Sequence, residues 1–122
     1  MADTAVATYK GRFIQVAFTG AGASWDFSTD TGVPLEMRNL GRLKVMSITF
    51  IPSATADKCV ITEGTGSGGP IVYEAMAIET TSGVVNEDKK NYDKGMWMRP
   101  YFDLSKSTLT TPTSAFIVFE LG

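Results

Sequence analysis

Apolar and polar residues alternate along several short stretches of this chain, and this pattern limits the possible fold more than any other feature. The stretch 44–51 shows it most clearly, because Met46, Ile48 and Phe50 fall on one side of an extended chain and hydroxyl residues fall on the other. No stretch keeps the helical period of about 3.6 residues for long. The sequence therefore predicts an all-β domain, either a single β-sandwich or a jelly-roll-like barrel of about six to eight strands.

Segments rich in β-branched and aromatic residues, separated by Gly, Pro, Ser and Thr, mark the expected strands. Strands are predicted at 13–18, 24–27, 44–51, 58–62, 71–78, 95–102 and 115–121. Pro100 lacks the N–H group that a ladder needs, so its strand is expected at a sheet edge or with a bulge. The stretches 28–41 and 79–93 are predicted mostly as loops, the second with a brief strand at 84–85. The core is expected to contain Ile48, Phe50, Ile61, Ile71, one of Phe116 and Ile117, and one of Phe119 and Leu121.

A glycine-rich stretch at 64–69 lies between two of these apolar segments. A phosphate-binding loop presents its backbone N–H groups at the start of a helix, usually together with a lysine. Here Pro70 and a β-branched strand follow instead. The stretch is therefore predicted as the tip of a β-hairpin.

The 122 residues predict a single domain, with residues 1–7 as a flexible N-terminal arm, because they are small and polar and carry no strong pattern. The first residues combine no basic segment with a following apolar stretch, so no signal peptide is expected. No apolar run reaches the length of about 18–20 residues that crosses a bilayer, so no membrane partner is expected.

The chain contains no histidine, and this absence narrows the possible chemistry. It removes the commonest general base, the commonest zinc ligand and the Ser-His and Cys-His nucleophile pairs. The lone Cys59 lies in an expected strand and is interpreted as a buried, inert thiol. The net charge of −2 and the scattered basic residues argue against nucleic-acid binding. The sequence therefore predicts no enzyme, no cofactor and no metal site.

Six carboxylates, most of them outside the expected strands, do not have the spacing of a calcium-binding loop. A glycosidase pair facing across a cleft is not visible in a sequence alone. These side chains are interpreted as solvated surface charges, and they are Asp26, Asp30, Glu79, Glu87, Asp88 and Asp93.

Trp97, Arg99 and Tyr101 alternate along one expected strand and would share one of its faces. Arginine and aromatic residues dominate interface hot spots, and an arginine between two rings suits cation–π stacking. The alternative is that the rings of Trp97 and Tyr101 lie in the core and that only Arg99 reaches the solvent. The candidate interface joins this row to the start of the arm, and its residues are Trp97, Arg99, Tyr101, Met1, Ala2, Asp3 and Thr4.

Several segments in the last two thirds of the chain carry a family resemblance: 46–53, 57–61, the glycine-rich turn before Ile71, 96–103 and 111–115. With them the chain resembles small proteins that tailed bacteriophages encode near their capsid genes. The resemblance implies a virion component, either a capsid decoration (cement) protein or a related accessory structural protein. It attaches no chemistry to any residue.

The expected function is that of a non-enzymatic virion structural protein, made in the host cytoplasm, that docks on the assembled shell and stabilises it. The expected partners are the major capsid protein or another virion protein, together with further copies of the chain. The alternative is a β-sandwich module that binds a carbohydrate or a host surface through Trp97 and Tyr101. An enzyme is the third hypothesis, and no legible nucleophile–base pair supports it.

Overall fold

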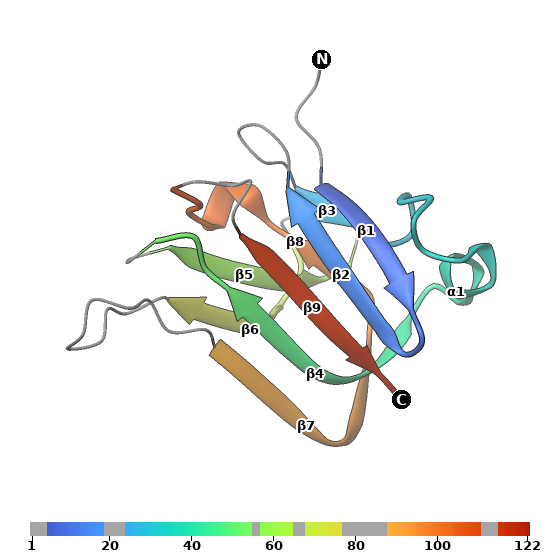
Figure 1. Ribbon diagram of the computed structural model, residues 1–122. Coiled ribbons are helices and arrows are strands. Elements are labelled where there is room, and N and C mark those ends of the chain that lie inside the picture. The colour runs from blue at the N-terminus through green and yellow to red at the C-terminus, as the bar shows by residue number, and fades with distance from the viewer. Residues whose placement is uncertain (1–4, 19–23, 55–56, 65–67, 77–87, 111–114) are drawn as a thin grey trace.

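A computed structural model of the chain describes residues 5–18, 24–54, 57–64, 68–76, 88–110 and 115–122. In these residues two antiparallel sheets pack against each other (Figure 1), so the predicted all-β sandwich is confirmed. Some predictions fall outside the described residues. They concern Met1, Ala2, Asp3, Thr4, the hairpin tip at 65–67 and the brief strand at 84–85.

The larger sheet has five strands in the described residues, in the spatial order β1-β2-β9-β4-β7. Their bounds are β1 (Ala5–Lys10), β2 (Phe13–Phe18), β9 (Phe116–Leu121), β4 (Leu43–Ile51) and β7 (Asp88–Met98). The smaller sheet has four described strands in the order β3-β8-β5-β6. Their bounds are β3 (Trp25–Asp26), β8 (Pro100–Phe102), β5 (Lys58–Glu63) and β6 (Ile71–Met76). A six-residue helix, α1 (Leu35–Leu40), and a short 3₁₀ turn, η1 (Leu104–Lys106), complete the described elements.

The core lies between the two sheets and consists of side chains that alternate inward from both. Ile48, Phe50, Ile61 and Ile117 are wholly buried there, as predicted. Of the last predicted pair, both residues are buried: Phe119 at 0% and Leu121 at 6% exposure. The predicted hairpin is also present, because β5 and β6 pair in antiparallel fashion.

Two predictions from strand alternation were wrong, that Ile71 lies in the core and that Met46 shares a face with Ile48, and a register irregularity explains each. Ile71 is 50% exposed. Thr62 pairs with Ile71 next to the pair of Ile61 and Tyr73, so one β6 residue is skipped and the strand end turns away from the core. In β4 the register shifts between Val45 and Ser47, and odd-numbered residues face inward before this bulge. Met46 therefore leaves the face of Ile48 and is only half-buried.

The predicted arm was too long. Ala5 to Ala7 belong to β1, which pairs with β2 along its whole length. The backbone N–H of Ala7 donates to Asp30 Oδ2 at 2.8 Å, and the indole N–H of Trp25 donates to the same oxygen at 2.7 Å. Asp30 also accepts from the backbone N–H of Gly32 at 2.8 Å, so one carboxylate ties the loop after β3 to the edge of the large sheet.

Three further predictions, two about element boundaries and one about a strand's position in its sheet, differ from the structure. The stretch 28–41, predicted mostly as loop, contains α1. The stretch 79–93 was predicted as a surface loop, but its last six residues belong to β7, which begins at Asp88. The strand of Pro100 lies inside the small sheet and not at its edge. Pro100 is tolerated there because it opens β8, beyond the two residues where β3 pairs with that strand.

Candidate functional site

The row Trp97, Arg99 and Tyr101 does not lie on one sheet. Trp97 pairs with Lys44 in the five-stranded sheet, whereas Tyr101 pairs with Thr62 in the four-stranded sheet. The chain passes from one sheet to the other at Arg99. The inward and outward alternation continues through this crossing, because Met98, Pro100 and Phe102 are buried. The structure therefore separates the two aromatic residues of the predicted interface.

Trp97 is the exposed end of the row. Trp97 is 56% exposed, and it borders a small hollow of about 110 Å³ beside α1. Leu40, at the end of α1, is 68% exposed on the same hollow. We call this the tryptophan hollow, and its lining residues are Met37, Leu40, Arg42, Leu43, Lys44, Trp97, Leu121 and Gly122.

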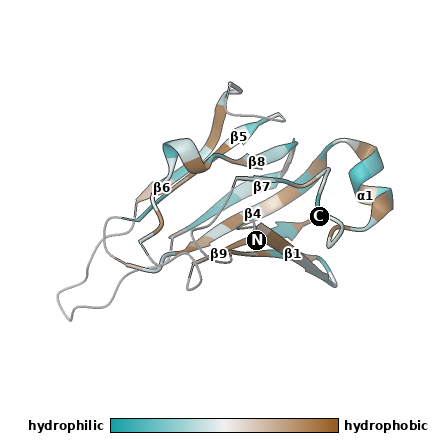
Figure 2. Ribbon diagram, turned by 90° about the horizontal axis from the view of Figure 1, so that it is seen from above, coloured by the Kyte–Doolittle hydropathy of each residue, from teal (hydrophilic) through white to brown (hydrophobic). Residues whose placement is uncertain are grey.

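The local sequence explains why Leu40 stays exposed. The helix begins after Pro34, a residue whose fixed φ suits a helix start, and it ends at Gly41 with φ of 73°. Six residues form less than two turns, and none of them is buried. Met37 packs against the core from one side, and the guanidinium Nε of Arg38 donates to the carbonyl of Val33 at 2.9 Å. Figure 2 shows α1 at one end of the sandwich, with hydrophobic residues on its ribbon.

Arg99 is held inside the molecule's own hydrogen-bond network. Its guanidinium donates to Ser28 Oγ at 2.8 Å, and its backbone N–H donates to Glu63 Oε1 at 3.1 Å. Its carbonyl accepts from the backbone N–H of Gly64 at 2.9 Å. Within the described part of the chain the cation–π contacts involve Arg12 with Phe13 and Lys90 with Tyr92, and none involves Arg99. Arg99 thus joins the sheet crossing to the turn after β3.

Tyr101 is half-buried on β8, between β3 and β5. Its backbone pairs with Asp26 on one side and with Thr62 on the other. This position gives it a structural role in the small sheet. Of the three predicted residues, only Trp97 presents most of its surface to the outside.

The sequence reasoning missed Leu40, because it interpreted 28–41 as loop. A signal was present: Pro34 and Gly41 frame a six-residue stretch with leucine at both ends, in the places where proline opens and glycine closes a helix. It also missed a second apolar surface on the outer face of the large sheet. Phe13 is 46% exposed there and borders a shallow hollow of about 460 Å³ with Val118.

The groups with shifted pKa values are structural. Burial raises the pKa of Asp57, but hydrogen bonds from Ser53 and Thr110 outweigh it and hold the pKa below its ordinary value of 3.8. Hydrogen bonds from Ser47 and Arg12 lower the pKa of Glu120. Cys59 is wholly buried, as predicted.

The described residues hold no group of three or more cysteine, aspartate or glutamate side chains that could bind a metal ion. They also form no helix that is long and apolar enough to cross a bilayer.

Comparison with known proteins gives no relative for this geometry: no family model, no curated protein and no solved structure matches the chain.

Proposed function

We propose that this chain is a non-enzymatic structural protein of a tailed-bacteriophage virion, a decoration (cement) protein that docks on the assembled capsid shell and stabilises it. The family resemblance of residues 46–115 suggests the virion, and the tryptophan hollow suggests the docking. The observation that carries the proposal is the pairing of two large exposed side chains, Trp97 at 56% and Leu40 at 68%, around one hollow. Tryptophan is among the residues most enriched in interface hot spots, and Leu40 adds apolar surface beside it.

The size of the hollow favours a protein partner over a free small ligand. Small-molecule sites enclose about 300–1,000 Å³. The tryptophan hollow encloses about 110 Å³, which suits one inserted side chain. A partner side chain placed there would contact Met37, Leu40 and Trp97 together. Burial of apolar surface contributes roughly 25 cal/mol per Å², so such an anchor adds measurably to the affinity.

The alternative, a carbohydrate- or host-surface-binding module, finds less support. It relied on Trp97 and Tyr101 as a joint aromatic platform, and these residues lie in different sheets. Sugar sites also need several placed polar groups around the ring. The side chains nearest to Trp97 around the hollow are largely aliphatic, apart from Arg42 and Lys44.

Cosedimentation with purified capsid shells of the encoding virus tests the proposal. The wild-type chain should sediment with the shells, and Trp97→Ala and Leu40→Ala should each weaken binding about tenfold or more. Ile71→Ala is the matched control, because it removes an equally exposed apolar side chain, at 50%, from the other sheet. It should bind like the wild type.

Two results would reject the proposal. Wild-type chain that stays in the supernatant with every shell preparation would remove the decoration role. Specific retention on a glycan array, lost in Trp97→Ala, would replace it with the carbohydrate-binding alternative.

A further inference from the structure

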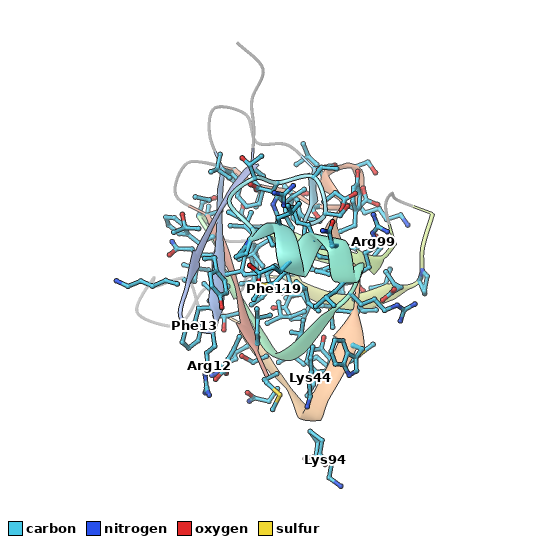
Figure 3. The ribbon with its side chains drawn as sticks, turned by 90° about the vertical axis from the view of Figure 1, so that its right-hand side faces the viewer. Arg12, Phe13, Lys44, Lys94, Arg99 and Phe119 are labelled. Carbon is cyan, nitrogen blue, oxygen red and sulfur yellow. The ribbon has the colours of Figure 1, made fainter. Side chains whose placement is uncertain are left out.

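Three surface hollows follow one another along the rim of the five-stranded sheet. The tryptophan hollow shares Leu121 and Gly122 with a second hollow of about 460 Å³, which Met46 and Lys94 also line. The second hollow reaches Arg12, whose neighbour Phe13 opens the third. Figure 3 shows Phe13, Arg12, Lys44 and Lys94 along one margin of the molecule, with Arg99 on another side. We call this surface the basic band.

The basic band has the opposite charge to the chain as a whole. The chain carries a net charge of −2. The three hollows are lined by five cations, Lys10, Arg12, Arg42, Lys44 and Lys94. Their lining includes two carboxylates, Asp93 and Glu120. Arg12 pairs with Glu120, which also accepts from Ser47 Oγ, and Arg42 pairs with Glu63 at 3.4 Å, so Lys10, Lys44 and Lys94 are the cations that remain for a partner within the described residues.

Lys94 reaches the band through an unusual piece of backbone. Val45 pairs with Met96 and Ser47 pairs with Asn91, so residues 92–95 bulge from β7 opposite one residue of β4. Lys94 has φ of 60°, which is the left-handed region and is costly for a residue with a Cβ atom. The bulge places an exposed lysine beside the second hollow.

The shape and charge of the band select one class of partner. A second copy in a two-fold contact would set these cations against themselves, and like charges at an interface cost several kcal/mol. A nucleic acid would meet the aliphatic side chain of Leu40, which offers it neither a hydrogen bond nor a stacking face, and the carboxylate of Asp93, which repels phosphate. A protein surface with acidic residues around apolar ones satisfies both parts of the band.

We infer that the basic band docks on an acidic protein surface, with Trp97 and Leu40 in apolar contact and the lysines Lys10, Lys44 and Lys94 opposite carboxylates. This inference rests on the proposed docking function and adds the chemistry of the partner. Exposed charges of this kind act mainly on the association rate, and salt screens them over about 8 Å at physiological ionic strength. Binding must therefore depend on salt.

Fluorescence of the full chain provides a direct test. Trp25 is 2% exposed and Trp97 is 56% exposed, so quenching by acrylamide reports on Trp97. The probes are a synthetic peptide of glutamate and leucine, the same peptide with lysine in place of glutamate, and a single-stranded oligodeoxynucleotide. The glutamate peptide should protect Trp97 from the quencher, and its affinity should fall about tenfold or more between about 0.05 M and about 0.5 M salt. The lysine peptide should give no protection.

A matched pair of variants locates the charge. The double variant Lys44→Gln and Lys94→Gln should bind the glutamate peptide about tenfold more weakly, because it loses two charge pairs across the interface. Lys58→Gln with Lys90→Gln removes the same charge from residues that line none of the three hollows and should leave binding within about twofold.

The outcomes separate this inference from the proposed function. Equal binding of both peptides, binding that ignores salt, or tighter binding of the oligonucleotide would overturn the acidic partner. Shells that bind the wild type and the Lys44 and Lys94 double variant equally would also overturn it, while the docking proposal would stand. Salt-dependent binding of the glutamate peptide without any shell binding would support the acidic partner and remove the virion role.

Discussion

Asp57 and Trp97 lie in opposite situations, and each reverses the usual placement of its residue type. The charged Asp57 is 0% exposed, whereas the largely apolar Trp97 is 56% exposed. The carboxylate is matched inside the chain: Oδ1 accepts from the N–H of Thr110 at 2.9 Å and from its hydroxyl at 2.7 Å. Oδ2 accepts from the N–H groups of Ser53 and Ala54 and from the Ser53 hydroxyl.

This contrast teaches how to separate the residues that stabilise the fold from those that could serve a function. Burying a charge is costly, and the five hydrogen bonds of Asp57 offset that cost within the molecule, so its placement serves the fold. Exposing a tryptophan gains nothing for the fold. The docking proposal assigns Trp97 to a partner, and under that proposal substitutions at the two positions should divide accordingly.

Of the two contrasted residues, Asp57 should show the larger effect on the free energy of unfolding. Asp57→Ala removes the acceptor of five hydrogen bonds, which come from the backbone or hydroxyl groups of Ser53, Ala54 and Thr110. Hydrogen bonds to a charged group contribute about 1.5–3 kcal/mol each, so unfolding free energy should fall by about 3 kcal/mol or more. Urea unfolding followed by circular dichroism measures it. A loss under about 1 kcal/mol would contradict the structural role of the carboxylate.

The pH dependence of the unfolding free energy should reveal the contribution of the Asp57 carboxylate. The folded-state pKa of Asp57 lies below its ordinary value of 3.8, so the folded state favours the ionised form. Its contribution to stability is then complete above that ordinary value and is lost as the pH falls through the lower folded pKa. Melting temperatures between pH 7 and pH 2 should drop in this acid range, and the drop should be smaller in Asp57→Ala. Parallel curves for the two proteins would contradict the assignment.

The fold could be predicted from the sequence where burial follows a simple alternation. Ile48 and Phe50 lie in the core because β4 alternates regularly after its bulge. Ile71 was predicted there too, but the skipped residue in the pairing of β5 and β6 turns it outward. Bulges depend on pairing between distant strands, and one segment alone does not reveal them.

The site was predictable only in part, for a similar reason. The alternation placed Trp97, Arg99 and Tyr101 on one face but left open whether that face lies outside or in the core, and in the structure Trp97 is 56% exposed. It gave no sign that the strand changes sheets at Arg99, because the inward positions stay buried through Pro100. The side chain of Leu40 comes to Trp97 only after β4 and β7 pair, a contact between segments far apart in the chain.

A smaller effect on the unfolding free energy is expected at Lys94, the residue of the basic band with a strained backbone. Lys94 has φ of 60°, and glycine takes this conformation without the Cβ penalty. Lys94→Gly should raise the unfolding free energy by about 0.5–1 kcal/mol, since relief of strain exceeds the added entropy of the unfolded chain. Lys94→Ala keeps the Cβ atom and should gain nothing. Destabilisation of the glycine variant in urea would show that the lysine side chain supports the bulge.

The smallest effect on stability is expected at Trp97, and this is the sharpest test of the contrast. Trp97→Ala removes a side chain that is already mostly in water, so the unfolding free energy should change by about 1 kcal/mol or less. Trp25 is the matched control in the same chain: it is 2% exposed, stacks on Phe119 with 5.6 Å between ring centroids, and donates to Asp30 at 2.7 Å. Trp25→Ala should cost about 3–5 kcal/mol, as large-to-small core substitutions do. Urea unfolding of both variants measures the difference. If Trp97→Ala costs as much as Trp25→Ala, the exposed tryptophan serves the fold, and the docking site must be sought elsewhere on the surface.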